Sequence, residues 1–257
     1  MPTTAVYPMT RPRTTRSRVE APLVVYGVNA VLELLRSGEP VDRLCLGRGP
    51  REAELSAAAH ARGVRVEAAD RPALDRLAGS PHHQGAVAVA PPFAYAPLER
   101  LLAPSSSSAL VLDGLQDPRN LGAILRTARA LGVGGVVLPR DRSVGVTPVV
   151  AAASAGLLFG LPVAQVPNLV RAMEALKAAG FWLVGLSPRG GTPLAHLEPP
   201  TRAAVVAGGE GGGLRPLVHR TCDFTASIPM APGVESLNVG VAIAIALYEL
   251  TARRVSS

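Results

Sequence analysis

The stretch Val205-Val-Ala-Gly-Gly-Glu-Gly-Gly-Gly-Leu-Arg215 runs from an apolar strand directly into glycines that surround one carboxylate. It lacks the Gly-Lys-Ser/Thr ending of a phosphate-binding loop and does not match Gly-x-Gly-x-x-Gly, so neither nucleotide motif is present. Glycines permit positive φ and let the backbone approach a flat ligand closely. Five glycines between Gly208 and Gly213, directly after a buried strand, favour a ligand site over a merely flexible turn.

A second segment, Asp113-Gly-Leu-Gln-Asp-Pro-Arg-Asn-Leu-Gly-Ala-Ile-Leu-Arg-Thr-Ala-Arg129, leaves another strand and turns through Pro118 into a helix. We expect Asn120 to cap that helix. Arg126 and Arg129 are three residues apart and share a helix face, and Arg119 precedes them at the helix start. These guanidinium groups make a phosphate-binding patch plausible, although the segment alone favours a capped surface helix with solvated arginines.

The third segment is Ile228-Pro-Met-Ala-Pro-Gly-Val-Glu-Ser-Leu-Asn238, which joins a strand to an apolar helix. Ser236 and Asn238 are candidate caps, and the free N–H groups at the helix start can hold a polar ligand. Taken alone, the segment indicates a buried core helix with a capped end.

Around these segments, short apolar strands alternate with helices. We expect strands at 109–112, 136–138, 163–166, 182–186, 203–207 and 224–228, and helices at 121–131, 169–179 and 239–253. This alternation predicts an α/β fold with a mainly parallel sheet covered on both faces. Ligands of such sheets bind beyond the carboxyl ends of the strands, which is where the three segments begin. We expect Trp182, which starts one strand, to lie in the core.

The preceding residues divide into three parts. Residues 21–91 predict a small α/β domain, with strands at 23–25, 41–46, 64–67 and 86–90 and helices at 29–36, 52–62 and 73–77. Residues 92–108, rich in proline and serine, predict a linker with one helical turn at 98–102, so the second domain covers 109–257. Residues 1–20 predict a disordered basic tail, whose Arg11, Arg13, Arg16 and Arg18 hold RNA loosely or are simply solvated.

The composition of the 257-residue chain, 48% hydrophobic and 18% charged, allows a sizeable core. The net charge of +7 favours a polyanionic partner, and arginine supplies every basic residue except Lys177, although a GC-rich genome also enriches arginine. Cys45 and Cys222 match no zinc or disulfide spacing, which indicates a reducing, cytoplasmic setting and no metal site. The uncharged stretch 147–170 contains three prolines, so we expect a helix and a buried strand there rather than a membrane span.

Together, the three segments resemble the three motifs of the SpoU (TrmH) family of RNA ribose 2′-O-methyltransferases, in order, over residues 109–254. Tyr26-Gly-Val-Asn-Ala-Val-Leu-Glu33 and His83-Gln-Gly-Ala-Val-Ala88 look like the substrate-binding domain of RlmB-type 23S rRNA members. The resemblance implies a SPOUT domain whose deep trefoil knot forms the S-adenosylmethionine pocket, and an L30e-like N-terminal domain. It also implies a homodimer with its active site at the subunit interface.

The resemblance also implies roles for residues. Arg126 is the expected catalytic residue, surrounded by Asn120, Glu210, Ser236 and Asn238. Expected cofactor contacts are Ala207, Gly208, Gly209, Gly211, Ile228, Met230, Ser236, Leu237 and Asn238. Expected RNA contacts are Arg119, Arg129, His83 and the four arginines of the tail, with a loop role as the alternative for His83. Many relatives have serine where this chain has Gly240, which leaves any role of that position open.

We therefore expect methylation of a ribose 2′-hydroxyl in 23S rRNA or a ribosomal precursor, on a guanosine. An arginine titrates too high to serve as a base, so Arg126 is expected to bind the target phosphate and stabilise the forming alkoxide. Placing the reactants in line supplies about 7 to 11 kcal/mol of the barrier, without a metal. One alternative is the same chemistry on another rRNA nucleotide, including the methylation that gives antibiotic producers self-resistance, or on tRNA. The other is a non-catalytic RNA-binding or assembly factor.

Overall fold

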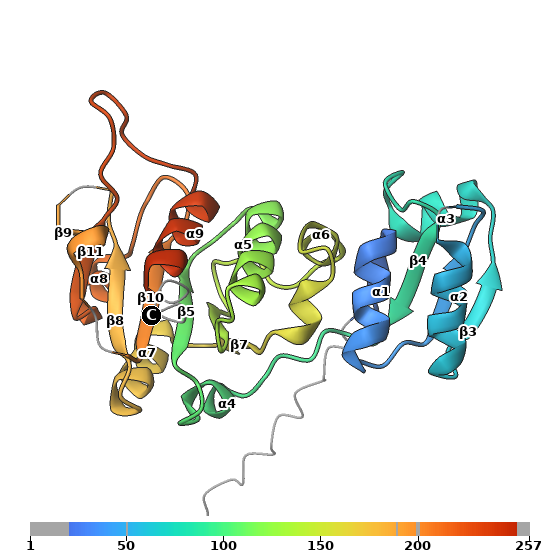
Figure 1. Cartoon of the computed structure of the whole chain (residues 1–257), viewed down its shortest axis with the longest axis horizontal. Helices are drawn as coiled ribbons and strands as arrows, with labels where there is room; N and C mark the ends of the chain where they lie inside the picture. The colour runs from blue at the N-terminus through green and yellow to red at the C-terminus, as the bar shows by residue number, and fades with distance from the viewer. Residues whose placement is uncertain (1–20, 50, 189, 199–200, 251–257) are drawn as a thin grey trace, which may run out of the picture.

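The structure is a computed structural model that describes residues 21–49, 51–188, 190–198 and 201–250. It contains a four-stranded and a seven-stranded sheet, which lie beside each other along the long axis of the molecule (Figure 1). The expected basic tail with its four arginines lies outside the described residues. No helix in these ranges is long and apolar enough to cross a membrane.

The N-terminal sheet alternates with three helices. Its elements are β1 (Leu23–Tyr26), α1 (Val28–Ser37), β2 (Arg43–Leu46), α2 (Glu52–Ala61), β3 (Arg65–Ala68), α3 (Arg71–Ala78) and β4 (Ala86–Ala90). The strand order is β1-β4-β2-β3, in which β4 is antiparallel to both neighbours and β2 is parallel to β3. The carboxyl ends of β2 and β3 therefore lie at the same sheet edge as the amino end of β4.

The second sheet is entirely parallel, as its apolar strands predicted. Its elements are β5 (Ser108–Asp113), α5 (Pro118–Ala130), β6 (Val136–Pro139), α6 (Pro148–Ala153), η1 (Leu157–Gly160), β7 (Val163–Val166), α7 (Leu169–Ala178), β8 (Trp182–Leu186), β9 (Thr192–Pro193), η2 (Leu194–His196), β10 (Ala203–Gly208), α8 (Pro216–Thr221), β11 (Phe224–Ser227) and α9 (Val239–Leu250). The strand order is β7-β6-β5-β10-β8-β11-β9. This order places β10 between β5 and β8, although β10 follows both in the sequence.

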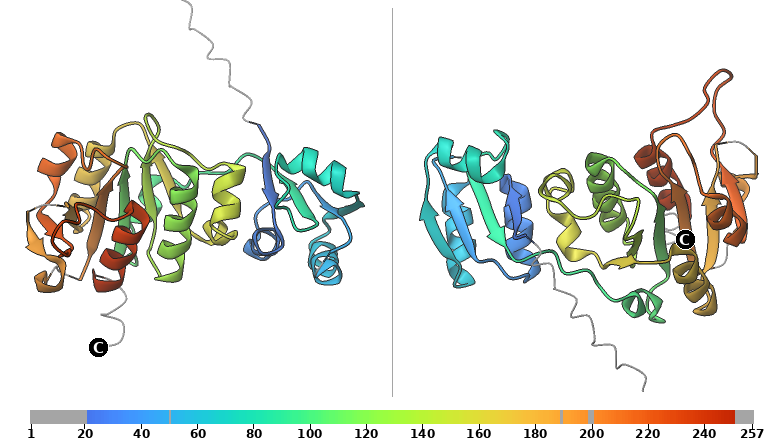
Figure 2. Two further views of the ribbon diagram at one scale, coloured as in Figure 1. Left: turned by 90° about the horizontal axis from the view of Figure 1, so that it is seen from above. Right: turned by 180° about the vertical axis from the view of Figure 1, so that it is seen from behind.

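Helices cover both faces of this sheet (Figure 2). In β5, Leu110 and Leu112 belong to one core cluster and Ala109 and Val111 to another, as the two-residue period of a strand requires. The first cluster includes residues of α5, α6 and α9, and the second includes residues of α7 and α8. Both faces of the sheet are therefore buried from solvent, which explains why its strands are almost wholly apolar.

The segment between the sheets packs against the second domain. It carries the short helix α4 (Leu98–Leu102), whose Leu101 is fully buried. The Tyr95 hydroxyl accepts a hydrogen bond of 2.8 Å from the Val146 amide, and Phe93 meets the Tyr95 ring edge-on. These contacts fix the path of the chain as it enters the second domain.

The two domains meet closely. Gly156, at φ +82°, leads from α6 into η1, and a Cβ atom there would lie 2.7 Å from the Ala30 carbonyl oxygen of α1. Ala30 is buried, and apolar residues of both domains form one continuous core cluster. Both views in Figure 2 show α1 and β1 against the yellow segment that contains α6 and η1. A side chain at position 156 would force the domains apart.

Two local expectations were wrong. The cap of α5 is Asp117, whose carboxylate accepts from the Arg119 amide at 2.8 Å, whereas Asn120 lies inside the helix. Trp182 is not in the core, because 43% of it is exposed at the start of β8, where its ring lies 5.7 Å from the Phe224 ring. The elements α8 and β9 had no counterpart in the expected pattern.

Candidate active site

A cavity of about 470 Å³ opens where β8, β10 and β11 end and α9 begins. All nine residues expected to contact a cofactor line it: Ala207, Gly208, Gly209, Gly211, Ile228, Met230, Ser236, Leu237 and Asn238. Its wall also includes Glu210 and the apolar side chains of Leu186, Ala226, Val239 and Ile243. The loops after β10 and β11 therefore meet at one concave site.

The glycine loop after β10 is folded tightly on itself. A Cβ atom at Gly208 would overlap the Gly213 carbonyl, and one at Gly209 would overlap the Gly114 carbonyl. Gly209 and Gly213 also form an isolated antiparallel bridge. The glycines are thus required by close backbone approach, and the resulting wall of the cavity presents main chain rather than side chains.

A buried carboxylate holds the far end of this loop. The Asp113 side chain has no exposed surface, and it accepts hydrogen bonds from the Arg215 amide at 2.9 Å and the Arg215 Nε at 2.6 Å. The Arg215 Nη2 atom lies 2.6 Å from the same oxygen, Oδ1, while Oδ2 accepts the hydrogen bond from the backbone amide. The pair links the end of β5 to the end of the glycine loop.

The start of α9 is capped by Asn238, as expected. Its Oδ1 atom accepts from the Gly240 amide at 2.9 Å and from the Val241 amide at 3.3 Å. A Cβ atom at Gly240 would lie 3.2 Å from that same oxygen. A serine at 240 would therefore crowd the cap. Ser236 lines the cavity but does not cap the helix.

Three side chains form a hydrogen-bonded chain at this cavity. Asn120 Nδ2 donates to Glu210 Oε1 at 2.6 Å, and Asn238 Nδ2 donates to Asn120 Oδ1 at 3.2 Å. The Glu210 Oε2 atom also accepts from the Gln116 amide at 3.4 Å. Each of the three sequence segments contributes one member of this chain, so the segments are joined directly rather than through the core.

The structure places Arg126 elsewhere. It is exposed on α5, is absent from the cavity wall, and its guanidinium pairs with no described residue. Successive helix residues are about 100° apart, so Arg126 lies on the same face as Arg119 and points away from the side that carries Asn120. Within one chain, the expected catalytic arginine and the cavity therefore remain separate.

The expected RNA contacts divide into two groups. Arg119 and Arg129 are exposed on α5, where Arg129 packs beside Gly160 of η1. His83 is only 3% exposed, and its ring nitrogens contact Asp75 at 3.0 Å and the Gly85 amide at 3.0 Å. Both ring nitrogens therefore serve the loop that contains His83, in keeping with the alternative loop role, and RNA contact by His83 stays a prediction.

Some residues of the site were not expected. Ser187 and Pro188 line the cavity after β8. In the sequence, only the predicted end of a strand at Leu186 could have pointed to them. Asp113 and Arg215 lie within the quoted segments, but sequence spacing does not indicate their pairing. Among the described residues, no group of three or more His, Cys, Asp or Glu could hold a metal ion.

Comparison with protein families supports the three-segment resemblance. Residues 107–248 match the SpoU rRNA methylase family, and residues 24–96 match the family model of RNA 2′-O ribose methyltransferase substrate binding. A protein of Staphylococcus aureus assigned to the TrmH family of tRNA/rRNA methyltransferases is 38% identical over 239 residues. That alignment covers 90% of this chain and 96% of the relative.

Solved structures give the same result for the fold. The SpoU methyltransferase AviRb from Streptomyces viridochromogenes, in complex with AdoMet, has a TM-score of 0.80 at 28% identity and covers 95% of each chain. An AdoMet-bound rRNA methyltransferase from Sinorhizobium meliloti has a TM-score of 0.77 at 26% identity, covering 91% of this chain and 87% of that one. Both similarities extend across the two domains.

Proposed function

The chain belongs to the SpoU rRNA methylase family, and we propose that it transfers the methyl group of S-adenosylmethionine to a ribose 2′-hydroxyl of 23S rRNA, on a guanosine, in the cytoplasm. The observation that carries this proposal is the chain of hydrogen bonds from Glu210 through Asn120 to Asn238 beside the cavity. It joins the three family motifs at a site of suitable size for a small ligand.

The cavity fits S-adenosylmethionine by its chemistry. Backbone of the glycine loop and apolar side chains such as Leu186 and Ile243 suit a flat adenine, and the Glu210 carboxylate suits the positive charge of the sulfonium. When bound, this cofactor supplies a methyl group that is already activated toward a nucleophile. We assign its binding to the nine cavity residues expected from the sequence, and the knot around them belongs to the same proposal.

Arg126 has the role of holding RNA at the reacting sugar. Its guanidinium stays protonated at neutral pH, so it binds the phosphate next to the target ribose and stabilises negative charge that develops on the 2′-oxygen. The hydroxyl proton leaves to a phosphate oxygen or water. Arg119 and Arg129 on the same helix, together with the tail arginines, extend the phosphate-binding surface.

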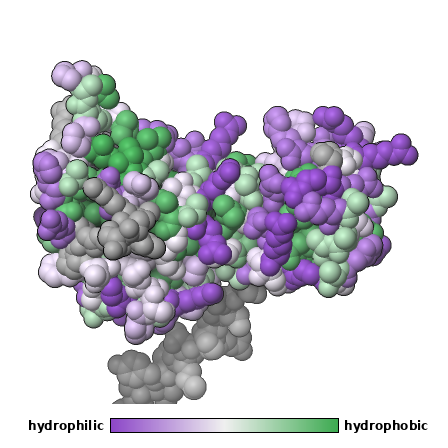
Figure 3. Space-filling view, in the orientation of Figure 1, coloured by the Kyte–Doolittle hydropathy of each residue, from purple (hydrophilic) through white to green (hydrophobic). Residues whose placement is uncertain are grey.

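A homodimer would bring Arg126 to a cavity. Val241, Ile245 and Tyr248 lie on one face of α9 and are 49%, 37% and 56% exposed, which is unusual for large apolar side chains. Their spacing of four and three residues forms a continuous stripe, and Figure 3 shows an apolar area where α9 lies in Figure 1. We assign this stripe to the subunit interface, where the active site is completed.

The test is methyl transfer from labelled S-adenosylmethionine to separate pools of rRNA and tRNA, followed by mapping of sites that resist alkaline cleavage. A single resistant guanosine in 23S rRNA is the expected result. Label in another rRNA nucleotide or in tRNA alone would reject the target but keep the chemistry. Cofactor binding without label in any RNA would reject the enzyme in favour of a non-catalytic RNA-binding factor.

A further inference from the structure

A second cavity, of about 990 Å³, lies in the N-terminal domain, away from the candidate active site. It is found at the edge where β2 and β3 end and β4 begins. Its wall consists of residues 46–49, 68–71 and 81–85, with Glu52 and Leu74. Three loops that are separate in sequence therefore surround it.

These loops hold one another in place through their backbones. The Gly47 amide donates to the Gly85 carbonyl at 2.9 Å, and the Ala69 amide donates to the Leu46 carbonyl at 2.8 Å. A Cβ atom at Gly47 would lie 2.9 Å from the Leu74 side chain. The cavity is thus formed in the free chain, and filling it requires little reorganisation of these loops.

His83 fixes the third loop from within. Its Nδ1 atom accepts from the Gly85 amide at 3.0 Å, so the proton resides on Nε2 and is donated to Asp75 at 3.0 Å. The neighbouring Gln84 has a φ of +53°, a conformation that non-glycine residues seldom adopt. The buried histidine thereby supports a strained residue at the border of the cavity.

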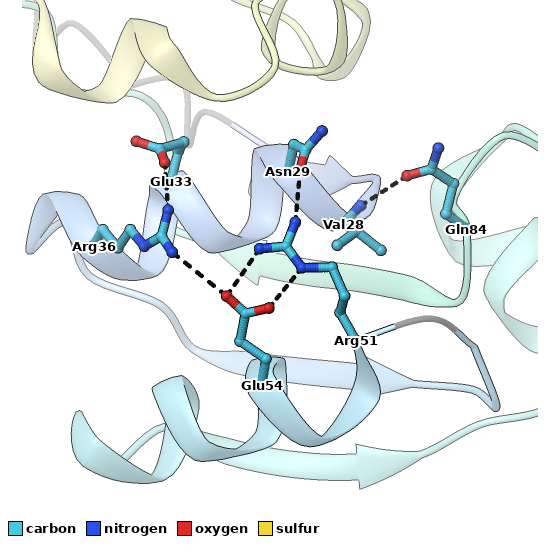
Figure 4. Close-up of polar contacts among 7 residues, drawn as sticks. All are labelled: Val28, Asn29, Glu33, Arg36, Arg51, Glu54 and Gln84. Carbon is cyan, nitrogen blue, oxygen red and sulfur yellow. Dashed lines mark hydrogen bonds and ion pairs between the residues drawn. The ribbon is translucent and has the colours of Figure 1, made fainter.

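Side-chain contacts on the other side of this border connect it to two helices (Figure 4). Gln84 Oε1 accepts from the Val28 amide of α1 at 3.2 Å. Arg51, which precedes α2 at a φ of +64°, donates to both Glu54 oxygens at 2.6 and 2.8 Å and to Asn29 Oδ1 at 3.0 Å. Arg51 therefore ties α1 to α2 through three hydrogen bonds.

Two arginines of the cavity wall contrast with this pattern. Arg48 and Arg71 form no ion pair, and their guanidinium groups form no hydrogen bond, with any described residue. The other described arginines of residues 21–91 differ from these two. Five of them bind carboxylates or backbone carbonyls: Arg36, Arg43, Arg51, Arg62 and Arg65. Only Arg76 also lacks such a partner among the described residues. Two unoccupied guanidinium forks beside a preformed hollow are suited to phosphate oxygens.

The hollow itself suits a base. Its lining includes Gly47, Gly49 and Gly85 and the Leu74 side chain, and Glu52, Asp70 and His82 add polar groups. Sequence-specific RNA recognition commonly binds unstacked bases by stacking on aromatic or arginine side chains and by hydrogen bonds to the base edges, and His82 and the two arginines are side chains of these kinds. The cavity lies at the upper edge of the N-terminal domain in Figure 1, and the loop between β11 and α9 also projects upward in that view. One RNA can therefore contact both sites from the same side.

We infer that this cavity binds one unstacked nucleotide of the substrate RNA, with its phosphates on Arg48 and Arg71 and its base in the hollow beside Leu74. The inference rests on the proposed function, because that function makes RNA the substrate. Residues 24–96 match the substrate-binding model of the family, and the inference assigns one RNA-recognition site of that domain to this cavity.

The test compares matched variants of the full chain for binding to transcribed 23S rRNA over a range of salt concentrations. Arg71→Ala and the double variant Arg48→Ala/Arg71→Ala should weaken binding about tenfold and a hundredfold, and the double variant should lower the salt slope by about 2. Arg76→Ala removes the same charge from α3 outside the cavity and should cost less than about threefold. Equal losses for Arg71→Ala and Arg76→Ala would overturn the inference.

A filling variant tests the hollow without changing charge. Ala68 is exposed at the cavity wall, so Ala68→Trp should block the base, weaken RNA binding about tenfold and leave the salt slope unchanged. Its thermal unfolding is measured in parallel, and wild-type affinity in a folded Ala68→Trp protein contradicts the inference.

The two proposals fail separately. If wild type methylates RNA and the cavity variants bind as tightly as Arg76→Ala, only the cavity assignment is lost. If wild type binds rRNA through the cavity but labels no RNA, only the enzymatic function is lost. If wild type binds no rRNA, the cavity assignment is rejected.

Discussion

Asn120 donates a hydrogen bond of 2.6 Å to Glu210, a residue 90 positions further along the chain. The contact is possible because β10 pairs with β5, so the loops that leave these strands start side by side. Asn238 then joins Asn120 from the start of α9. The Asn120 amide nitrogen thus orients Glu210, the carboxylate that the described residues supply to the cavity wall, and its oxygen accepts from Asn238. Asn120 is therefore a positioning residue.

Asn120→Asp should impair cofactor binding more than Asn120→Ala does. The aspartate would face Glu210 as a like charge, whereas alanine only removes the donor. We expect a loss of S-adenosylmethionine affinity of about tenfold for alanine and more for aspartate, corresponding to about 1 to 3 kcal/mol. Isothermal titration calorimetry measures both. Thr127→Ala is the control, because that hydroxyl bonds only the Ala123 carbonyl of its own helix. Better binding by the aspartate variant would disprove the positioning role.

Arg126→Ala should lower kcat without changing cofactor affinity, since Arg126 does not line the cavity of its own chain. Removing a donor that stabilises developing charge typically costs about a hundredfold or more in kcat. Arg129→Ala removes the same charge three residues away and should mainly raise KM for RNA. Steady-state kinetics with the RNA identified by label transfer separate the two effects. Full turnover by Arg126→Ala would remove it from the mechanism.

Ile245→Glu should separate the subunits. It places a charge in the centre of the exposed stripe on α9, where burial of an unpaired carboxylate is costly. Light scattering should give a dimer for wild type and a monomer for the variant, with methyl transfer lost and the fold retained. Leu217→Glu is the control, because Leu217 is also exposed, at 55%, but belongs to α8. A dimeric, active Ile245→Glu protein would reject the assigned interface.

The positions of most strands could be predicted from the sequence. A strand buried on both faces is apolar throughout, so β7 and β8 were predicted with their observed ends. The cap of α5 could have been assigned correctly, because proline favours the first helical position and Pro118 therefore points to Asp117 as the cap.

Other features have no local signal. The exposure of Trp182 depends on its place at the start of β8, which an apolar pattern does not indicate. The partner of Asp113 depends on the order of the strands, and Arg215 is its partner only because β10 lies beside β5. The arginine-lined cavity of the N-terminal domain likewise arises from three loops that only the folded sheet brings together.

Cys222 should react slowly with iodoacetamide at neutral pH. Burial raises the pKa of its thiol to about 12, with a further increase from the Asp223 carboxylate and a smaller opposing effect of Lys177. The alkylation rate should therefore rise about tenfold per pH unit from pH 8 to 11, without a plateau near 9. Because the folded-state pKa is raised, the thiol's contribution to stability is present below pH 9 and is lost as the pH rises toward 12. Mass spectrometry of the modified peptide measures the rate, and a plateau near pH 9 would contradict the assigned burial.

Gly208→Ala should abolish cofactor binding, whereas Gly212→Ala should leave it intact. A methyl group at 208 would overlap the Gly213 carbonyl, and backbone cannot move aside as a flexible side chain can. No heavy atom lies within 4 Å of a Cβ atom at 212, and the φ of Gly212 is not in the positive range, so that position accepts alanine.

Gly211 has the same open space but a φ of +79°, so Gly211→Ala should cost about 1 kcal/mol of stability through strain alone. Calorimetric titration with S-adenosylmethionine, alongside urea unfolding, distinguishes the three variants. Tight binding by Gly208→Ala would show that the glycine loop does not form the wall of the cofactor site.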